Sequence, residues 1–263
     1  MHRFFIQLSY NGTNYHGWQA QKNTVKTIQH VIDTMLSKLL NEPIKVMGCG
    51  RTDTGVHATE YFAHFDSTKI DLIENKAKWL FKFNHALPED IAIRNIFHLK
   101  NNENARFHAI SRTYKYYISP LKNPFQINMA YFFYGDLNVS EMNKAAKLLF
   151  NHSDFSAFAK TGAQTSTNNC KIYLAEWTEE NGQLVFTISA NRFLRNMVRA
   201  IVGTLMKVGK GIMTLDEFNE VVLSKNRSNA GLSAHASGLY LVKVDYPENY
   251  FEKSITDNID YQN

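Results

Sequence analysis

The order of strand-like and helix-like segments is the feature that most constrains the fold of this chain. Residues 27–40 carry apolar side chains at the i, i+3, i+4 and i+7 positions, which predicts an amphipathic helix. Shorter apolar runs bounded by turn residues predict strands on both sides of that helix. The predicted strands are 3–10, 44–47, 59–66, 91–99, 113–119, 130–134, 171–178, 183–190 and 239–245, and the predicted helices are 27–40, 72–83, 140–150 and 192–208.

The two halves of the chain have a similar order of elements. This order predicts two units that each combine strands with helices, with residues 1–104 in the first and 105–263 in the second. Turn and capping signals mark several element ends. Asn181-Gly182 predicts a hairpin turn, Ser140 is the expected N-cap of the helix 140–150, and the Thr214-x-x-Glu217 spacing predicts a capping box that opens a further helix.

The composition is that of a soluble globular protein, because 44% of the residues are hydrophobic and 20% are charged. Cys49 and Cys170 lack the spacing of a zinc site or a disulfide framework. No apolar run approaches the length of a membrane span, and the N-terminus enters a strand-like segment without a signal peptide. We therefore expect a cytoplasmic protein, with disorder confined to the polar end around residues 256–258.

Basic residues are clustered in two stretches without any acid. The net charge is only +5, but residues 104–135 and 191–211 contain no Asp or Glu. Basic residues mixed with aromatic ones suit nucleic acid, through phosphate neutralisation and base stacking. Two solvated faces would give the same pattern. The basic residues are Arg106, Arg112, Lys115 and Lys122 in the first stretch, and Arg192, Arg195, Arg199, Lys207 and Lys210 in the second.

Three arginines have helical spacing within the predicted helix 192–208. Arg192, Arg195 and Arg199 stand at i, i+3 and i+7, largely opposite the apolar stripe of that segment. Such a face either contacts solvent or lines an anionic cleft.

The loop Gly50–His57 places a single carboxylate, Asp53, in a turn flanked by glycines. Such a loop is either a structural turn or an active site. It has neither the GK[ST] ending of a phosphate-binding P-loop nor the GxGxxG order of a dinucleotide site. His57 lacks the further ligands of a metal site, so we expect it to brace the loop.

Motifs along nearly the whole chain resemble the tRNA pseudouridine synthase A family. GRTDTGVHA at residues 50–58 is similar to the signature of that family. Further similar segments, in the order of the family, are Tyr15–Gln19 (YHGWQ), Asn84–Ile91 (NHALPEDI), Ala105–Tyr116 (ARFHAISRTYKY), Asn196–Gly203 (NMVRAIVG) and Gly238–Pro247 (GLYLVKVDYP).

The resemblance implies an isomerase that converts uridine to pseudouridine at positions 38, 39 and 40 of the tRNA anticodon stem-loop. It implies an α+β pseudouridine-synthase fold, in which two similar domains with mainly antiparallel mixed sheets, flanked by helices, enclose a basic cleft. It also implies a homodimer in which one tRNA contacts both subunits. No metal and no cofactor is expected, because the reaction needs neither redox change nor external energy. The polar segment 160–169 is expected to touch RNA or to cap the cleft.

The same resemblance suggests roles for individual residues. Asp53 is the expected nucleophile, whether it attacks C1′ or C6 or assists elimination to a glycal. Arg199 is expected to pair with Asp53 and favour its ionised form. Tyr114 matches the active-site tyrosine, which stacks on the flipped base and is a candidate for proton transfer. Arg51 is expected to contact phosphate or to fill the space of the extruded nucleotide, and Leu239 to form the apolar wall under the base. Arg192 and Arg195 are expected to bind the RNA.

Two other functions are compatible with parts of the sequence. A non-catalytic tRNA-binding protein would keep the basic residues, although the set Asp53, Tyr114 and Arg199 argues against it. A glycoside or nucleoside hydrolase would need a second carboxylate beside Asp53. Glu60 and Asp66 are the available acids, but the predicted strand after the loop should carry both away from Asp53.

Overall fold

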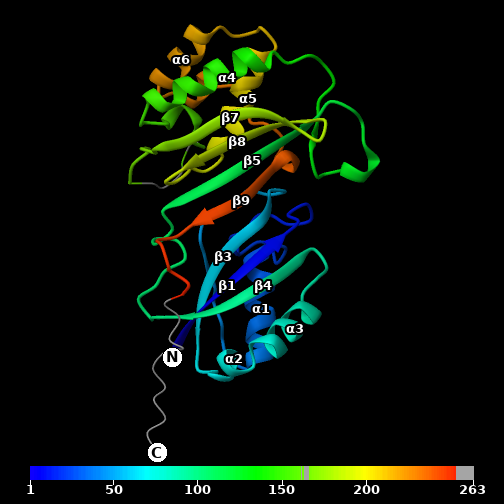
Figure 1. Ribbon diagram of the computed structural model, residues 1–263, viewed down its shortest axis with the longest axis vertical. Coiled ribbons are helices and arrows are strands. Elements are labelled where there is room, and N and C mark those ends of the chain that lie inside the picture. Colours follow the sequence, from blue (N-terminus) through cyan, green and yellow to red (C-terminus); the bar gives the residue numbers. More distant parts are fainter. Residues whose placement is uncertain (161, 163–165, 253–263) are drawn as a thin grey trace, which may run out of the picture. The chain divides into compact units, whose positions relative to one another are not determined.

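The computed structural model describes residues 1–160, 162 and 166–252. The chain forms two compact units (Figure 1). Unit 1 comprises Met1–Ile110 together with the residues from Lys243 onward, and unit 2 comprises Ser111–Val242. The fold is α+β with mainly antiparallel strands flanked by helices, which confirms the predicted class. Residues 161 and 163–165 of the polar segment 160–169, and the polar end at 256–258, lie outside the described residues.

The sheet of unit 1 is built on β1 (His2–Tyr10), which lies between β4 (Ile91–Leu99) and β3 (His57–Ser67). Both pairings are antiparallel, and Phe5 stands opposite His64 on one side and Phe97 on the other. The short strand β2 (Met47–Gly48) pairs with β3. The predictions of strands at 3–10, 59–66 and 91–99 are confirmed. The predicted strand 44–47 is reduced to β2, which begins at its last residue.

The helices of unit 1 are α1 (Ile28–Leu40), α2 (Asp71–Glu74) and α3 (Lys76–Ala86). The Thr27 hydroxyl accepts a hydrogen bond from the backbone of α1 and so caps its first turn. The predicted helix 72–83 is interrupted. Asn75 leaves the helical conformation there, ending α2 and preceding α3.

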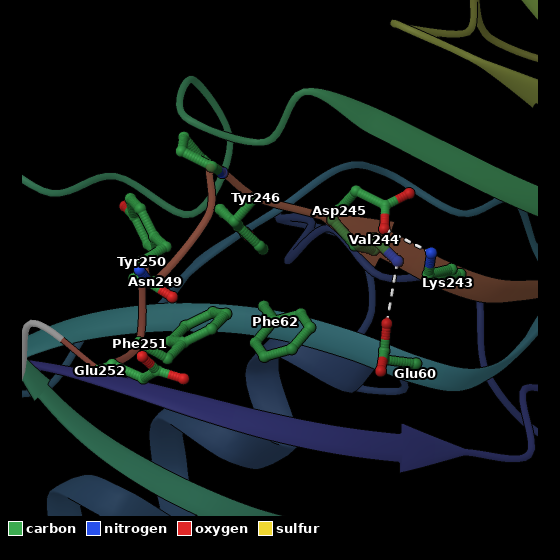
Figure 2. Close-up of a pocket in the computed structure, with 11 residues that line it drawn as sticks. Glu60, Phe62, Lys243, Val244, Asp245, Tyr246, Asn249, Tyr250, Phe251 and Glu252 are labelled. Carbon is green, nitrogen blue, oxygen red and sulfur yellow. Dashed lines mark hydrogen bonds and ion pairs between the residues drawn. The ribbon is translucent and has the colours of Figure 1, made fainter.

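The C-terminal segment 243–252 packs onto the sheet of unit 1. The Val244 N–H donates to Glu60 Oε1 at 2.9 Å, and this bond borders an open hollow beside Phe62 (Figure 2). The Tyr246 ring lies edge-on to Phe62 with centroids 5.3 Å apart. The Tyr246 hydroxyl donates to the Ala105 carbonyl at 2.6 Å. Residues from both ends of the sequence therefore complete one unit.

His64 is a buried histidine in the middle of β3. Its Nδ1 accepts a hydrogen bond from the Ala105 N–H at 3.1 Å, and its ring stacks on Phe5. Burial and the nearby positive charge of Arg3 lower the pKa of His64 from 6.5 to about 4. The imidazole is therefore neutral at pH 7, and its proton is on Nε2.

We expect the lowered pKa of His64 to make the folded protein sensitive to mild acid. The stabilisation by the neutral ring is fully present above pH 6.5, and it is lost as the pH falls toward 4, because the unfolded chain binds the proton more readily. The expected loss is about 3 kcal/mol in the free energy of unfolding. In His64→Asn, the amide oxygen keeps the bond to Ala105 without titrating. Urea unfolding from pH 4 to 7.5 should give a flatter profile for this variant, and equal profiles would contradict the assignment.

The sheet of unit 2 has the strand order β5 (Ser111–Ser119), β8 (Gln183–Ala190), β7 (Ile172–Glu180), all antiparallel. The predicted hairpin is confirmed. Asn181 and Gly182 join its strands with φ values of 51° and 73°, which is the backbone of a tight hairpin turn. Two further strands are β6 (Tyr131–Phe132), parallel to β5, and β9 (Leu239–Asp245), as predicted for 239–245.

The helices α4 (Val139–Leu148), α5 (Met197–Gly209) and α6 (Leu215–Leu223) lie together over this sheet (Figure 1). The capping box of Thr214 at the start of α6 is confirmed. The N-cap of α4 is Asn138 and not Ser140, because the Asn138 side chain accepts the Glu141 N–H at 3.1 Å. Short 3₁₀ turns occupy Pro124–Gln126, Leu149–Asn151, Ser156–Phe158, Arg227–Asn229 and Ala236–Gly238.

The prediction of one continuous helix over 192–208 is wrong at its start. Asn196 has φ 67°, in the left-handed region, and α5 begins only at Met197. Arg192 and Arg195 therefore lie in the connection before the helix, and only Arg199 lies on it. The three arginines do not form one helix face.

Candidate active site

The loop Gly50–His57 connects β2 to β3 in unit 1. The Cys49 N–H donates to the Phe62 carbonyl at 2.8 Å, so the loop leaves the sheet beside the strand to which it returns. Its tip is a tight turn in which the Val56 N–H donates to the Asp53 carbonyl at 3.1 Å. Gly55 has φ 77°, which glycine adopts without steric cost. Asp53 thus opens a defined turn, and the residue is partly buried.

Buried aromatic side chains hold this loop from beneath. The Tyr61 hydroxyl donates to the Gly50 carbonyl, and the Tyr10 hydroxyl lies 2.8 Å from Thr52 Oγ1. The Trp18 backbone N–H donates to the Thr52 carbonyl at 3.2 Å, and the Trp18 indole stacks on Tyr61 with centroids 4.1 Å apart. The backbone on the N-terminal side of Asp53 is therefore fixed on both sides of Arg51.

Two glycines near the N-terminus allow a second loop to touch the Asp53 loop directly. A Cβ atom on Gly17 would lie 2.4 Å from the Thr52 carbonyl oxygen, and Gly17 has φ 84°. A Cβ on Gly12 would lie 2.0 Å from the Val56 carbonyl oxygen. The Gly12 N–H also donates to His57 Nδ1 at 3.1 Å. His57 therefore braces the loop, as predicted.

The other acids near the loop in sequence have structural partners. Glu60 accepts hydrogen bonds from Gln7 and from the Val244 N–H. Asp66 forms two hydrogen bonds of 2.8 Å with the Arg3 guanidinium. This hydrogen bonding lowers the pKa of Asp66. The hydrolase alternative needs one of these carboxylates beside Asp53, and their partners bind both elsewhere.

Arg51 is exposed and is oriented by a series of amide side chains. Its Nε donates to Gln19 Oε1 at 3.1 Å, and Gln19 Nε2 donates to Gln29 Oε1 at 2.5 Å. Gln29, on α1, donates in turn to the Val46 carbonyl at 2.9 Å. The Arg51 guanidinium is thus connected to a helix of unit 1. The YHGWQ segment contained Gln19, but its spacing from Arg51 gave no sign of this contact.

In unit 2, β5 carries Tyr114, which the resemblance marks as the active-site tyrosine, and Tyr116. Tyr114 is buried opposite Ile188 of β8, and its ring meets Phe193 edge-on with centroids 5.2 Å apart. The Tyr116 hydroxyl donates to the His235 carbonyl at 2.8 Å, and burial raises its pKa. The Tyr116 hydroxyl is thus engaged with the backbone of the segment before β9.

Arg199 and Leu239 both adjoin the segment before β9: Arg199 is hydrogen-bonded to it, and Leu239 follows it in the chain. Arg199 Nε donates to the Ala234 carbonyl at 2.7 Å. The positive charge of Arg199 lowers the pKa of the Tyr116 hydroxyl, although burial raises that pKa by more. The two side chains therefore lie near each other. Leu239 is buried at the start of β9, next to Gly238, where a Cβ would lie 2.9 Å from the Tyr116 ring. Unit 2 thus gathers Tyr116, Arg199 and the chain leading to Leu239.

The remaining basic residues are more dispersed than their sequence clusters indicated. Lys115 forms an ion pair of 2.8 Å with Glu180 of β7. A basic residue from the acid-free stretch 104–135 is therefore paired with an acid from another part of the chain. Arg195 is exposed, and its carbonyl accepts the Lys160 N–H at 3.0 Å. Arg192 is half-buried, and its positive charge favours the thiolate of Cys170, whose burial nevertheless raises its pKa to about 11.

The candidate residues are divided between the two units. Unit 1 holds Asp53 and Arg51, and the pairing of Asp53 with Arg199 of unit 2 stays a prediction. Among the described residues, no group of three His, Cys, Asp or Glu side chains could hold a metal ion. Within the same residues, no helix has the length and apolarity needed to cross a bilayer. The predicted residues in unit 2 are Tyr114, Arg192, Arg195, Arg199 and Leu239.

Comparisons with known proteins give a consistent result. The family model described as tRNA pseudouridine synthase matches residues 145–247. A protein from Bacteroides fragilis is 46% identical over 251 residues, which cover 95% of this chain and 98% of that protein. Relatives from Parabacteroides distasonis and Ruminiclostridium cellulolyticum are 47% and 40% identical, over 95% and 94% of this chain and 98% and 100% of their own. All three are called tRNA pseudouridine synthase A.

The match to the family model and the α+β fold with mainly antiparallel strands together indicate a pseudouridine synthase. Enzymes of that class are isomerases. The identities of 40% to 47% extend over nearly the whole length of the chain. The chain belongs to the tRNA pseudouridine synthase A family.

Proposed function

We propose that the protein isomerises uridine to pseudouridine at positions 38, 39 and 40 of the tRNA anticodon stem-loop, with Asp53 as nucleophile on a flipped-out uridine. The observation that carries this proposal is the fixed loop around a partly exposed Asp53, while the acids near it in sequence are bound elsewhere. A nucleophile needs a defined position and access to its substrate. The hydrogen bonds that hold the loop and the partial exposure of Asp53 support this role.

The reaction requires few protein groups. The N1–C1′ bond breaks, the uracil turns, and a bond forms between C5 and C1′. The proton lost from C5 balances the one gained at N1, so the product is an isomer and no electrons are exchanged. One carboxylate can support the break and the closure. Tyr114 is proposed to stack on the base and to take part in the proton transfer at C5.

The roles proposed for the cations and for the apolar wall follow from the family resemblance. Arg199 uses its Nε on Ala234, so the proposed pairing with Asp53 would use its terminal NH groups. That pairing would favour the ionised carboxylate. Arg51 is proposed to contact phosphate or to fill the space of the extruded nucleotide, and Leu239 to lie beneath the base. We further propose a cytoplasmic homodimer in which one tRNA contacts both subunits.

Release of tritium from tRNA that carries [5-³H]uridine tests the activity. The proposed enzyme should release one tritium for each pseudouridine formed, and only in transcripts with uridine at positions 38, 39 or 40. A hydrolase would release free uracil, and a binding protein would release nothing. Substitution of each of the three uridines by cytidine provides the matched substrate control.

Gln19→Ala should weaken substrate use without changing the fold. The amide orients the Arg51 guanidinium, so its loss leaves Arg51 with more conformations to restrict on binding. We expect kcat/KM for tRNA to fall about tenfold, mainly through KM. Gln21→Ala is the control, because Gln21 lies nearby in sequence but donates to the His16 carbonyl instead. Equal values of kcat/KM for the two variants would indicate that Arg51 does not contact the substrate.

Arg192→Glu combined with Arg195→Glu should weaken tRNA binding by about 10- to 100-fold at moderate salt. Both residues lie in the connection that leads into α5. Loss of two phosphate contacts should reduce the slope of log affinity against log salt concentration by about 1.5 to 2. The variant Lys144→Glu with Lys147→Glu on α4 makes the same change in net charge. A similar loss of tRNA affinity in both double variants would mean that net charge alone, and not contact by Arg192 and Arg195, causes the effect.

A further inference from the structure

The segment that leads into β9 is irregular, but side chains of unit 2 hold it in place. We call residues 231–238 the pre-β9 segment, which contains only the 3₁₀ turn Ala236–Gly238. Residues in its first half accept side-chain hydrogen bonds of 2.6 to 3.1 Å. The donors are Arg227 to Gly231 and Ser233, Asn196 to Ser233, Arg199 to Ala234, and Tyr116 to His235. The segment therefore has a defined backbone before any substrate binds.

The imidazole of His235, in the middle of the pre-β9 segment, is exposed and yet held on two sides. The Ser237 N–H donates to His235 Nδ1 at 3.3 Å, and the Ser237 hydroxyl lies 2.8 Å from the same nitrogen. The ring stacks on Tyr131 of β6, with centroids 6.4 Å apart and an angle of 19° between the planes. Because an N–H can donate only to a lone pair, Nδ1 carries no proton, and the proton of the neutral ring is on Nε2.

The Nε2–H group of His235 is a fixed hydrogen-bond donor. Among the described residues, none forms a hydrogen bond with this nitrogen. The contacts with Ser237 and Tyr131 restrict the side chain, so the donor loses little entropy when it binds an acceptor. The preceding residue, Ala234, binds Arg199 through its carbonyl. His235 therefore places a directional donor beside a cation of the candidate site.

The charge around His235 favours an anionic acceptor. Residues 221–244 contain no Asp or Glu. Arg227 donates to uncharged oxygens of the pre-β9 segment, so its positive charge is not neutralised there. A hydrogen bond from an N–H to an ionised oxygen is stronger than one to a neutral carbonyl. Phosphate oxygens are also frequent acceptors in complexes of proteins with nucleic acids. The ionised acceptor that tRNA offers is its phosphodiester.

We propose that His235 donates through Nε2–H to the phosphodiester beside the uridine that is isomerised. The inference rests on the proposed function, in which Leu239 lies beneath the flipped base and Arg199 pairs with Asp53. Leu239 directly follows the pre-β9 segment, so the backbone of the nucleotide above Leu239 passes close to His235. The contact forms on binding and persists through the reaction, because the phosphodiester takes no part in the chemistry. It therefore acts on KM and not on kcat.

Two substitutions separate the donor of His235 from its structural contact with Ser237. In His235→Asn, the amide oxygen can take the place of Nδ1 and accept from Ser237, but no atom reaches the position of Nε2. In His235→Gln, the amide nitrogen reaches the position of Nε2, while the acceptor for Ser237 is lost. Steady-state tritium release from [5-³H]uridine tRNA and thermal unfolding of the full chain compare both variants with the unsubstituted protein.

The two variants should show opposite defects. His235→Asn should raise KM for tRNA about tenfold, through loss of one hydrogen bond to a charged group, with kcat within about twofold and an unchanged transition temperature. His235→Gln should keep KM within about twofold and lower the transition temperature by about 2 to 4 °C. The same two substitutions at His85, an exposed histidine on α3, should change neither quantity. A raised KM in His235→Gln alone would assign His235 a capping role and overturn the proposal, as would an unchanged KM in both variants.

A change in the substrate tests which acceptor His235 binds. tRNA assembled by ligation can carry one uncharged methylphosphonate linkage on the 5′ or the 3′ side of uridine 39. At one of these linkages, the unsubstituted protein and His235→Asn should have similar KM values, because the acceptor that distinguishes them is weakened. An undiminished difference in KM at both linkages would overturn the proposal, since the acceptor would then be another group, such as the uracil. Absence of tritium release by the unsubstituted protein would instead refute the proposed function, and filter binding of the same tRNAs would still report on the contact of His235.

Discussion

Asp53→Asn is expected to lower kcat for pseudouridine formation by roughly 10⁴-fold or more, because the amide cannot act as the nucleophile. The change keeps the size of the side chain and leaves untouched the contacts that hold the loop, which involve Gly50, Thr52 and Val56. The dissociation constant for tRNA should therefore change by less than about threefold. Single-turnover tritium release and filter binding measure the two quantities.

Glu60→Gln is the matched control for Asp53→Asn. It also neutralises a carboxylate in unit 1, but its Oε1 can still accept the Val244 N–H. Activity within a few-fold of the unsubstituted protein is expected. If Glu60→Gln were as inactive as Asp53→Asn, a two-carboxylate mechanism would replace the single nucleophile. If Asp53→Asn lost tRNA binding as its main defect, Asp53 would be a binding residue instead.

Gly203→Ala is expected to destabilise unit 2 by about 3 kcal/mol, the upper part of the range for overpacking. Gly203 lies in the middle of α5, where a Cβ would be 1.8 Å from the Leu232 carbonyl oxygen and 3.3 Å from the Ala234 nitrogen. The helix or the segment 230–236 must move. Because Ala234 accepts the hydrogen bond of Arg199, that movement should also reduce turnover, by about tenfold at temperatures where the variant is folded.

Gly50→Ala provides the comparison for Gly203→Ala, because a Cβ on Gly50 would have no atom within 4 Å. Its free energy of unfolding should change by less than about 0.5 kcal/mol. Differential scanning calorimetry should show a lower transition temperature, by about 6 to 12 °C, for Gly203→Ala alone. Equal transition temperatures would mean that α5 can shift away from Leu232 at little cost.

Local patterns were sufficient to predict most elements. The strands β4 and β9 have the predicted bounds, and α1 and the β7–β8 hairpin are close to them. Each has a signal within its own residues: alternating or periodic apolar side chains, a Thr cap, or an Asn-Gly turn. Such signals depend on short-range sterics and hydrogen bonding, so they predict these elements without knowledge of the tertiary contacts.

The start of α5 shows where local patterns fail. Residues 192–208 have a helical apolar stripe, but the hydrogen bonds of the connection are made at long range. Asn196 Nδ2 donates to Ser233 Oγ at 2.6 Å, and the Arg195 carbonyl accepts from Lys160. These partners lie more than 30 residues away in sequence. The left-handed Asn196 is therefore set by tertiary contacts that override helix propensity.

The candidate site was predictable in part for the same reason. The glycines around Asp53 indicated a tight turn, and the turn is present. The support beneath it was not predictable from spacing, because Tyr10, Trp18 and Tyr61 come from separate parts of the chain. The close contact of Gly12 with Val56 was not predictable either, because the two residues are far apart in sequence. Only the fold brings these residues to one place.

The return of residues 243–252 to unit 1 sets an order for folding during synthesis. Unit 2 has its full set of residues once Val242 has left the ribosome. Unit 1 contains the first residues made, yet it still lacks the backbone group that binds Glu60 and the ring that covers Phe62. Unit 1 therefore cannot be completed until residues 243–252 have been synthesised, although most of its residues are made first. A chain that ends at residue 242 would have a complete unit 2 and an incomplete unit 1, the unit that carries Asp53.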